Sequence, residues 1–219
     1  VDNKLIETII KAIDPRPNDI IVEIGAGLGT LTKRLATLGP KIKAVEIDPR
    51  LVRVLKDRFS TFENVEIIHG DFMEMLIEGN IFTGNIPYHI STPIMFKIIN
   101  QEYDKIVVTV QKEVADRIVS KPGSKEYGRL TVSVNLRANP QLLSIFPPHS
   151  FYPPPKVYHA VLFIEPLKKV AHSENLDLLL RVMFSQRNKI AKKVLRNWLL
   201  REYGEKGVQI YSSIDQVIP

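Results

Sequence analysis

Residues 20–30 read IIVEIGAGLGT, and this stretch carries the strongest indication of the fold. The apolar run Ile20–Ile24 is typical of a buried β-strand. It leads directly into three glycines at alternate positions, Gly25, Gly27 and Gly29. Glycine lets the backbone turn tightly and approach a ligand where any Cβ would collide. The stretch therefore predicts a strand, a tight loop and a helix, and the loop is either a ligand cradle or only a turn.

Strand and helix patterns alternate from this loop outward as far as residue 166. We expect helices over residues 2–13, 28–38, 49–59, 91 onward and 112–119, and strands over residues 20–24, 42–47, 65–69, 80–84, 103–110, 142–146 and 157–165. Residues 129–138 are rich in β-branched side chains, but the alternating order favours a helix there. Such alternation predicts an α/β fold: a doubly wound, Rossmann-like domain with a mostly parallel seven-stranded sheet, plus a small helical C-terminal domain.

The sequence becomes helical, charged and basic after Pro166. We therefore divide the chain into an α/β domain over residues 1–167 and a small α-helical domain over residues 168–219. From Arg181 to Arg201 there are seven Lys or Arg residues and no Asp or Glu, which predicts a basic helix that binds phosphates rather than a solvated face of mixed charge. The packing face expected for it is apolar: Leu180, Met183, Phe184, Ile190, Val194, Leu195 and Trp198.

The composition is that of a globular protein with a basic surplus: 44% hydrophobic residues, 25% charged residues and a formal net charge of +6. The surplus favours a polyanionic partner, most commonly nucleic acid, over a merely Lys/Arg-rich thermophilic surface. Cysteine is absent, which excludes disulfides and thiolate metal sites. The lack of cysteine fits a reducing cytoplasm, where we expect the protein to be. No segment has the length of a membrane span, and no signal-peptide pattern opens the chain. The chain opens at Val1 rather than at methionine, and we expect a segment to precede it.

Two acidic residues follow the glycine loop at the ends of the next two strands. Glu46 lies about 20 residues beyond the loop, where an acidic residue can hydrogen-bond a ribose diol. Asp71 ends the third strand, where a carboxylate can accept from an adenine amine. Either could be a solvent-exposed loop carboxylate if it stood alone. Together with the loop, the two acids indicate an adenosine-containing ligand.

Residues 85–88 read NIPY and follow the expected strand over residues 80–84. Ligands of a doubly wound sheet bind beyond the carboxyl ends of its strands. The side-chain oxygen of Asn85 and a carbonyl held by Pro87 are two acceptors for both hydrogens of an exocyclic amine. Tyr88 offers a flat face for a stacked base. The segment indicates a clamp for an aminopurine, and the alternative is a strand-ending turn whose tyrosine packs in the core.

The glycine loop, the acids and this clamp resemble the S-adenosylmethionine-dependent methyltransferases that act on exocyclic amines. The closer resemblance is to the ribosomal RNA small-subunit adenine N6,N6-dimethyltransferases, the KsgA family, in its archaeal and eukaryotic form. Matching motifs run in order from Val1 to about Leu199: residues 23–32, 85–93, 111–115, 127–130, 151–157 and 184–189. The Gln-x-Phe-Leu segment that the family carries before its first helix is absent here, and the C-terminal domain is short.

The resemblance implies an enzyme of ribosome biogenesis that dimethylates the N6 amines of two adjacent adenosines in a loop near the 3′ end of small-subunit rRNA. It implies S-adenosylmethionine as cofactor, no metal, no membrane, the immature small ribosomal subunit as partner, and a monomer. The catalytic residues expected are Asn85, Pro87, Tyr88 and Phe151. Those expected to bind the cofactor are Glu23, Gly25, Gly27, Gly29, Glu46, Ile47, Asp71, Phe72 and Asn85. Those expected to bind RNA are Arg187, Lys189, Lys192, Lys193 and Arg196.

Three other functions share parts of this pattern. A resistance-type methyltransferase of large-subunit rRNA has the same clamp, but the proline-rich loop with Lys156–Val157 and the insert Lys121–Lys125 argue against it. A non-catalytic ribosome assembly or transcription factor of the same fold is disfavoured by the intact clamp. A nicotinamide-dependent oxidoreductase is disfavoured by the glycine spacing, which is G-x-G-x-G rather than G-x-G-x-x-G.

Overall fold

The structure is a computed structural model that describes residues 2–167 and 174–215. The chain divides into two compact units, Val1–Val170 and Ala171–Pro219, and each is described by itself. The domain boundary was predicted between residues 167 and 168. It borders residues 168–173, which lie outside the described residues.

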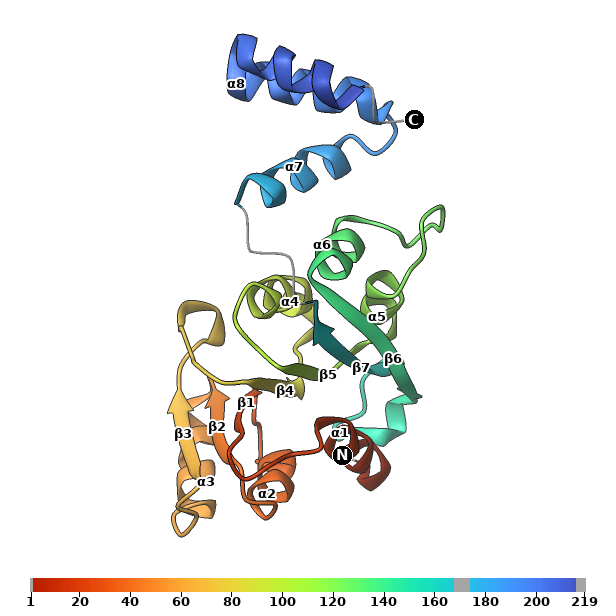
Figure 1. Cartoon of the computed structure of the whole chain (residues 1–219). Helices are drawn as coiled ribbons and strands as arrows, with labels where there is room; N and C mark the ends of the chain where they lie inside the picture. The colour runs from red at the N-terminus through yellow and green to blue at the C-terminus, as the bar shows by residue number, and fades with distance from the viewer. Residues whose placement is uncertain (1, 168–173, 216–219) are drawn as a thin grey trace. The chain divides into compact units, whose positions relative to one another are not determined.

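Within its described residues, the first unit is built on a seven-stranded sheet in the order β3-β2-β1-β4-β5-β7-β6 (Figure 1). Neighbouring strands are parallel from β3 to β5, whereas β7 pairs antiparallel with both β5 and β6. The mostly parallel seven-stranded sheet predicted from the sequence is thus confirmed. The strands are β1 (Ile20–Ile24), β2 (Lys41–Glu46), β3 (Val65–His69), β4 (Ile81–Asn85), β5 (Lys105–Gln111), β6 (Ala138–Phe146) and β7 (His159–Pro166).

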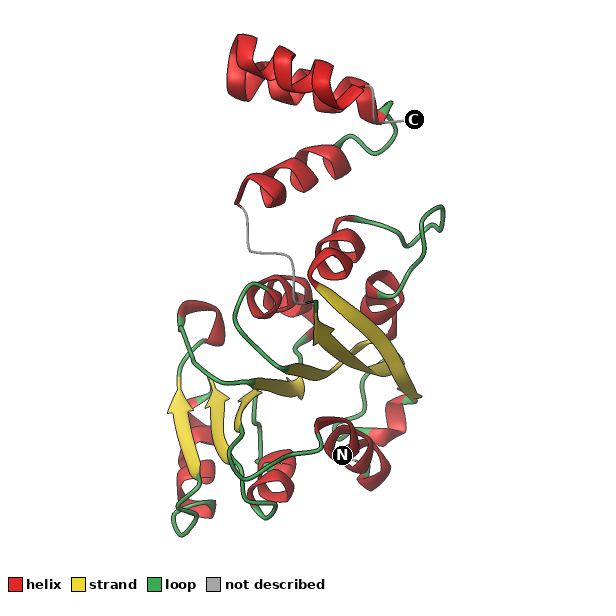
Figure 2. Cartoon of the chain, viewed as in Figure 1, coloured by secondary structure: helices red, strands yellow, loops and turns green. Residues whose placement is uncertain are grey.

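Helices cover both faces of this sheet (Figures 1 and 2). On one face lie α1 (Asn3–Ile13), α2 (Thr30–Ala36) and α3 (Pro49–Arg58), and on the other lie α4 (Ser91–Ile99), α5 (Lys112–Ile118) and α6 (Arg129–Arg137). Short 3-10 helices interrupt the loops: η1 (Phe72–Glu74), η2 (Tyr88–Ile90) and η3 (Pro148–Ser150). Each face has its own hydrophobic cluster, because the apolar stripes of its helices pack on strands that are buried on both sides.

Local differences from the expected elements have physical causes. Residues 129–137 form α6, so the alternating order outweighed their β-branched composition. The sixth strand begins at Ala138 rather than at residue 142, although it contains Pro140. Proline is tolerated there because β6 is the last strand of the sheet and one of its edges is unpaired. The fourth strand runs one residue further than expected and ends at Asn85.

The strand order reverses between β1 and β4, which makes this pair the topological switch point of the sheet. Both strands are parallel, so the glycine loop after β1 and the NIPY segment at the end of β4 leave the sheet at the same edge. Gly84 lets the two strand ends approach, since a Cβ added there would lie 2.3 Å from the Ile24 carbonyl oxygen and its φ is +141°. The fold alone therefore brings the two predicted motifs together.

The second unit contains α7 (Glu174–Ser185) and α8 (Ala191–Asp215). The backbone leaves the helical region at Gly204, so α8 consists of two helical segments. A Cβ added at Gly207 would lie 2.0 Å from the Leu199 carbonyl oxygen, so the second segment packs closely against the end of the first. Trp198 is buried there and meets Tyr203 edge-to-face, with ring centroids 5.8 Å apart.

Two expectations for this unit are wrong. The basic stretch Arg181–Arg201 is not one helix, because α7 ends at Ser185 and α8 begins only at Ala191. Ile190 lies in the connection and is 63% exposed, so it does not belong to the packing face. Leu180, Val194 and Trp198 are buried as expected.

Candidate active site

The glycine loop turns by placing all three of its alternate glycines in the left-handed region. The φ angles are +72° at Gly25, +59° at Gly27 and +74° at Gly29, where L side chains are strained. The amides of Gly25 and Ala26 donate to the carbonyl of Val45 at 2.9 and 3.1 Å, which ties the start of the loop to β2. The loop is therefore a fixed turn with its backbone facing the switch point.

Glu46, at the end of β2, binds this loop through its carboxylate. Its Oε2 accepts from the Gly27 amide at 2.8 Å, and its Oε1 accepts from the amides of Ile47 and Asp48 at 2.9 and 3.0 Å. Each carboxylate oxygen has two acceptor sites, so Glu46 can still accept from a ligand hydroxyl. The sequence predicted its place at the end of β2 but not this contact across to the loop.

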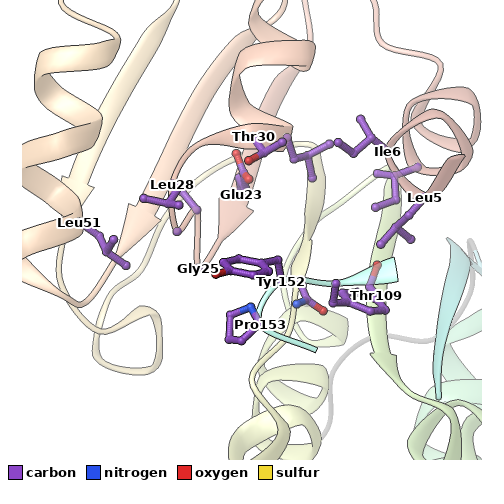
Figure 3. Close-up of a pocket in the computed structure, with 16 residues that line it drawn as sticks. Leu5, Ile6, Glu23, Gly25, Leu28, Thr30, Leu51, Thr109, Tyr152 and Pro153 are labelled. Atoms are coloured by element: carbon purple, nitrogen blue, oxygen red, sulfur yellow. The ribbon is translucent and has the colours of Figure 1, made fainter. Parts of the chain in front are cut away.

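A cavity of about 430 Å³ lies between the glycine loop, the N-terminal helix α1 and residues 151–153 of the proline-rich loop. Figure 3 shows Leu5 and Ile6 on one side, Leu28 and Leu51 on the other, and Tyr152 with Pro153 near Gly25. The remaining lining residues that bear on the site are Glu23, Asn85, Thr109 and Phe151. Apolar walls around few polar groups are typical of small-molecule sites.

Glu23 is the acidic side chain in the wall of this first cavity. It is 3% exposed, and its Oε2 accepts from the Thr32 hydroxyl at 2.6 Å. Burial raises the pKa of Glu23 from 4.5 to about 7, because the ionised carboxylate loses its hydration. A cationic ligand group in the cavity would favour the ionised form.

A second cavity of about 340 Å³ lies beyond the ends of β2 and β3. Its walls include Glu46, Ile47, Asp71, Phe72 and Pro87. Asp71 uses Oδ1 to accept from the Met73 amide at 2.8 Å, and it starts η1 by doing so. The two cavities have Gly25 and Asn85 in common, so they are two halves of one site.

Asn85 is exposed at the end of β4. Its backbone carbonyl oxygen lies 4.0 Å from where a Cβ of Gly25 would be. The next residue, Ile86, is buried, and its amide donates to the Thr109 carbonyl of β5 at 2.9 Å. Ser91 then donates from its hydroxyl to the carbonyls of Pro87 and Tyr88, both at 3.0 Å. The clamp segment is thus anchored by neighbours at both ends while the Asn85 side chain stays open to the site.

Tyr88 and Phe151 share one aromatic neighbour, His159. The His159 ring centroid is 5.0 Å from that of Tyr88 and 4.5 Å from that of Phe151. Tyr88 is 43% exposed, whereas Phe151 is buried but lines the first cavity. Burial lowers the pKa of His159, so its ring is neutral at neutral pH. Its Nδ1 donates to the Val157 carbonyl at 3.1 Å.

The structure also adds residues that the motifs did not indicate. Gly84 had a sequence signal, since glycine inside a strand often marks close backbone approach. Thr109 had a weaker one, a lone hydroxyl in an apolar strand. Its Oγ1 is buried in the wall of the first cavity, without a hydrogen-bond partner among the described residues. His159 had none, because its position between two aromatic rings arises only from the packing of β7.

The predicted RNA-binding residues lie in the second unit around the start of α8. Arg187, Lys189, Lys193 and Arg196 are exposed, and Lys192 is half-buried. Arg187 and Lys189 precede the helix, while the other three lie in its first two turns. They form a basic end of this unit rather than one face of a single helix.

Two further features are absent from the described residues. No group of three or more His, Asp or Glu side chains there could hold a metal ion. No helix in the same residues is long and apolar enough to cross a membrane.

Comparison with known proteins gives a consistent result. Residues 1–216 match the ribosomal RNA adenine dimethylase family. The probable ribosomal RNA small subunit methyltransferase A of Methanopyrus kandleri is 38% identical over 201 residues, covering 89% of this chain and 72% of that protein. A dimethyladenosine transferase from Plasmodium falciparum has a similar structure, with a TM-score of 0.85 and 29% identity over 100% of this chain and 82% of its own. The 23S rRNA methyltransferase ErmE, at 24% identity and a TM-score of 0.73, covers 98% of this chain and 88% of its own and has the same fold.

Proposed function

Because the chain belongs to the ribosomal RNA adenine dimethylase family, we propose that it methylates two adjacent adenosines in a loop near the 3′ end of small-subunit rRNA. Its family makes it an rRNA adenine N6-dimethyltransferase that uses S-adenosylmethionine. The proposal adds the site on the RNA, a cytoplasmic monomer as the active form, and the immature small ribosomal subunit as substrate in ribosome biogenesis.

The observation that carries the proposal is the approach of the clamp to the glycine loop. Asn85 borders both cavities, and its backbone carbonyl oxygen lies 4.0 Å from where a Cβ of Gly25 would be. An amine held by Asn85 therefore lies beside whatever the glycine loop holds. Methyl transfer requires this arrangement, because the two reacting groups must be adjacent and aligned before the reaction.

The residues of the two cavities suit an adenosyl sulfonium cofactor. Glu46 would accept from the ribose hydroxyls. Asp71 would accept from the adenine amine, because its Oδ2 accepts no hydrogen bond from the described residues. Glu23 in the first cavity would face the ammonium at the methionine end. Bound there, the cofactor supplies an electrophilic methyl group on sulfur. Because a sulfonium is already a strong electrophile, the proposal includes no metal ion.

The clamp residues prepare the amine of the target adenine. That amine is a poor nucleophile because its lone pair is delocalised into the ring. The Asn85 side-chain oxygen and a backbone carbonyl held by Pro87 accept from both N–H groups, which favours a tetrahedral nitrogen with a localised lone pair. The Ser91 hydroxyl donates to the Pro87 and Tyr88 carbonyls, so this backbone is positioned before the substrate arrives.

Tyr88 is the exposed stacking face for a base that leaves its strand. Such stacking contributes about 1–3 kcal/mol per base. By family resemblance, Phe151 would stack on the other face of that base, and it lines the first cavity beside His159. The Arg187–Arg196 end of the second unit would supply phosphate contacts that do not depend on base sequence.

The test uses immature small ribosomal subunits, labelled S-adenosylmethionine and reverse-transcription mapping. We expect label in small-subunit rRNA and stops at two neighbouring adenosines near its 3′ end, absent from RNA incubated without enzyme. Label in large-subunit rRNA would favour the resistance-type activity instead. Absence of label, with RNA binding retained, would favour an assembly factor of the same fold.

A further inference from the structure

Lys97 of α4 makes three contacts with one loop of the cofactor site. Its Nζ donates to the carbonyl of Met73 at 2.7 Å and to that of Met75 at 2.6 Å. The same ammonium lies 5.1 Å from the centroid of the Phe72 ring, within the range of a cation–π contact. Lys97 is half-buried, so these charge-assisted bonds are partly shielded from water.

The loop that Lys97 contacts carries the adenine end of the site. Asp71, Phe72 and Met73 line the second cavity, and η1 covers only three residues before the chain becomes irregular. A loop this short has few backbone bonds of its own to fix its shape. The Met75 side chain packs where a Cβ of Gly70 would lie, at 2.6 Å from its sulfur. The carbonyls of Met73 and Met75 each accept a hydrogen bond from the Lys97 side chain of α4.

The same helix also holds the target clamp. Ser91, its first residue, donates to the Pro87 and Tyr88 carbonyls, and Lys97 lies six residues further along. The helix is rigid between them, since Ile94, Met95 and Ile98 are buried in the core. One end of α4 therefore positions the groups for the target base, and the other end positions the groups for the cofactor adenine.

We propose that Lys97 is a positioning residue for the cofactor. It fixes the position of the Asp71–Met73 segment relative to the clamp residues 85–88. This rests on the proposed cofactor placement. Loss of the ammonium would leave two loop carbonyls without their donor and allow Asp71 to move from the adenine amine. The effect would fall on cofactor affinity and only slightly on RNA affinity, because Lys97 contacts no part of the clamp directly.

The test measures binding of S-adenosylmethionine and of its product S-adenosylhomocysteine by calorimetry to the whole chain. Lys97→Met keeps the apolar stem and removes the donor, so we expect the Kd to rise about tenfold or more. Lys97→Arg keeps the charge and should give an intermediate Kd. The matched control is Lys43→Met, because Lys43 donates to the Glu78 carbonyl at 2.8 Å, further along the same segment but outside both cavities. For that control we expect a change below about twofold.

A double-mutant cycle separates positioning from general stability. Asp71→Asn keeps the Oδ1 acceptor for Met73 but replaces an oxygen that could receive the adenine amine. If Lys97 acts by placing Asp71, Lys97→Met should cost much less in the Asp71→Asn background than in the wild type. Full additivity, an unchanged Kd, or an equal loss in Lys43→Met would overturn the inference. Failure of the wild-type chain to bind either ligand would instead refute the proposed cofactor site.

Discussion

Replacing the buried carboxyl of Glu23 by an amide, Glu23→Gln, should make the protein more stable at alkaline pH than the wild type. Burial raises the pKa of Glu23 from 4.5 to about 7. The folded state therefore keeps a proton that the unfolded state releases between these values. The stabilising contribution is present below pH 4.5 and is lost as the pH rises through about 7.

The magnitude follows from the width of that window. At about 1.36 kcal/mol for each pH unit, ionising Glu23 in the folded state costs about 3 kcal/mol above pH 7. Glutamine cannot ionise, and its side-chain oxygen can still accept from the Thr32 hydroxyl. The free energy of unfolding of Glu23→Gln minus that of wild type should thus increase by about 3 kcal/mol from pH 4.5 to pH 8.

Urea unfolding of the ligand-free protein at pH 4.5, 6, 7 and 8 measures this difference. Glu63→Gln, at an exposed position, is the matched control and should give a nearly constant difference. A difference for Glu23→Gln that also stays flat across this range would show that burial does not keep Glu23 protonated. S-adenosylmethionine supplies a second readout, because its ammonium should bind the wild type more tightly as the pH rises through 7 and show a weaker trend in Glu23→Gln.

Three other substitutions test separate parts of the account. Gly84→Ala should lower the free energy of unfolding by roughly 2–4 kcal/mol in urea titrations, because the new methyl meets backbone in a φ region that disfavours it; a loss below about 0.5 kcal/mol would contradict the close approach of the strands. Tyr88→Ala should reduce methyl transfer about 10- to 100-fold while Tyr88→Phe stays near wild type, and equal activities would remove the stacking role. Combined Ala substitutions at Lys189, Lys192 and Lys193 should weaken RNA binding and reduce its salt slope by about 2–3, whereas an unchanged slope would remove this end from the interface.

The sequence predicted the layers of the fold because its signals there are local. Each strand and helix has its own apolar period, and the order of the elements decided residues 129–137 where propensity alone would have misled. The glycine loop and the NIPY segment were predicted to bind ligand for the same reason, because their residue patterns are local. The family expected from these motifs is confirmed by the match over residues 1–216.

What the sequence did not reveal depends on contacts between distant segments. The Glu46 carboxylate reaches back to the Gly27 amide, and the Lys97 ammonium reaches the Met73 carbonyl. No local pattern encodes either contact. The extent of the basic helix was predicted wrongly. The basic charge and the apolar spacing continue through Ile190, but the helix stops at Ser185 and a new one begins at Ala191.

Methyl transfer by Asn85→Ala tests whether the end of β4 presents an adenine amine to the cofactor. Wild type and Asn85→Ala are incubated with S-adenosylmethionine and immature small subunits, and the RNA is digested to nucleosides for mass spectrometry. We expect N6,N6-dimethyladenosine from the wild type and a loss of about 100-fold or more in the variant, with cofactor affinity within a few-fold. Undiminished dimethyladenosine from a variant that binds cofactor normally would contradict this role of Asn85.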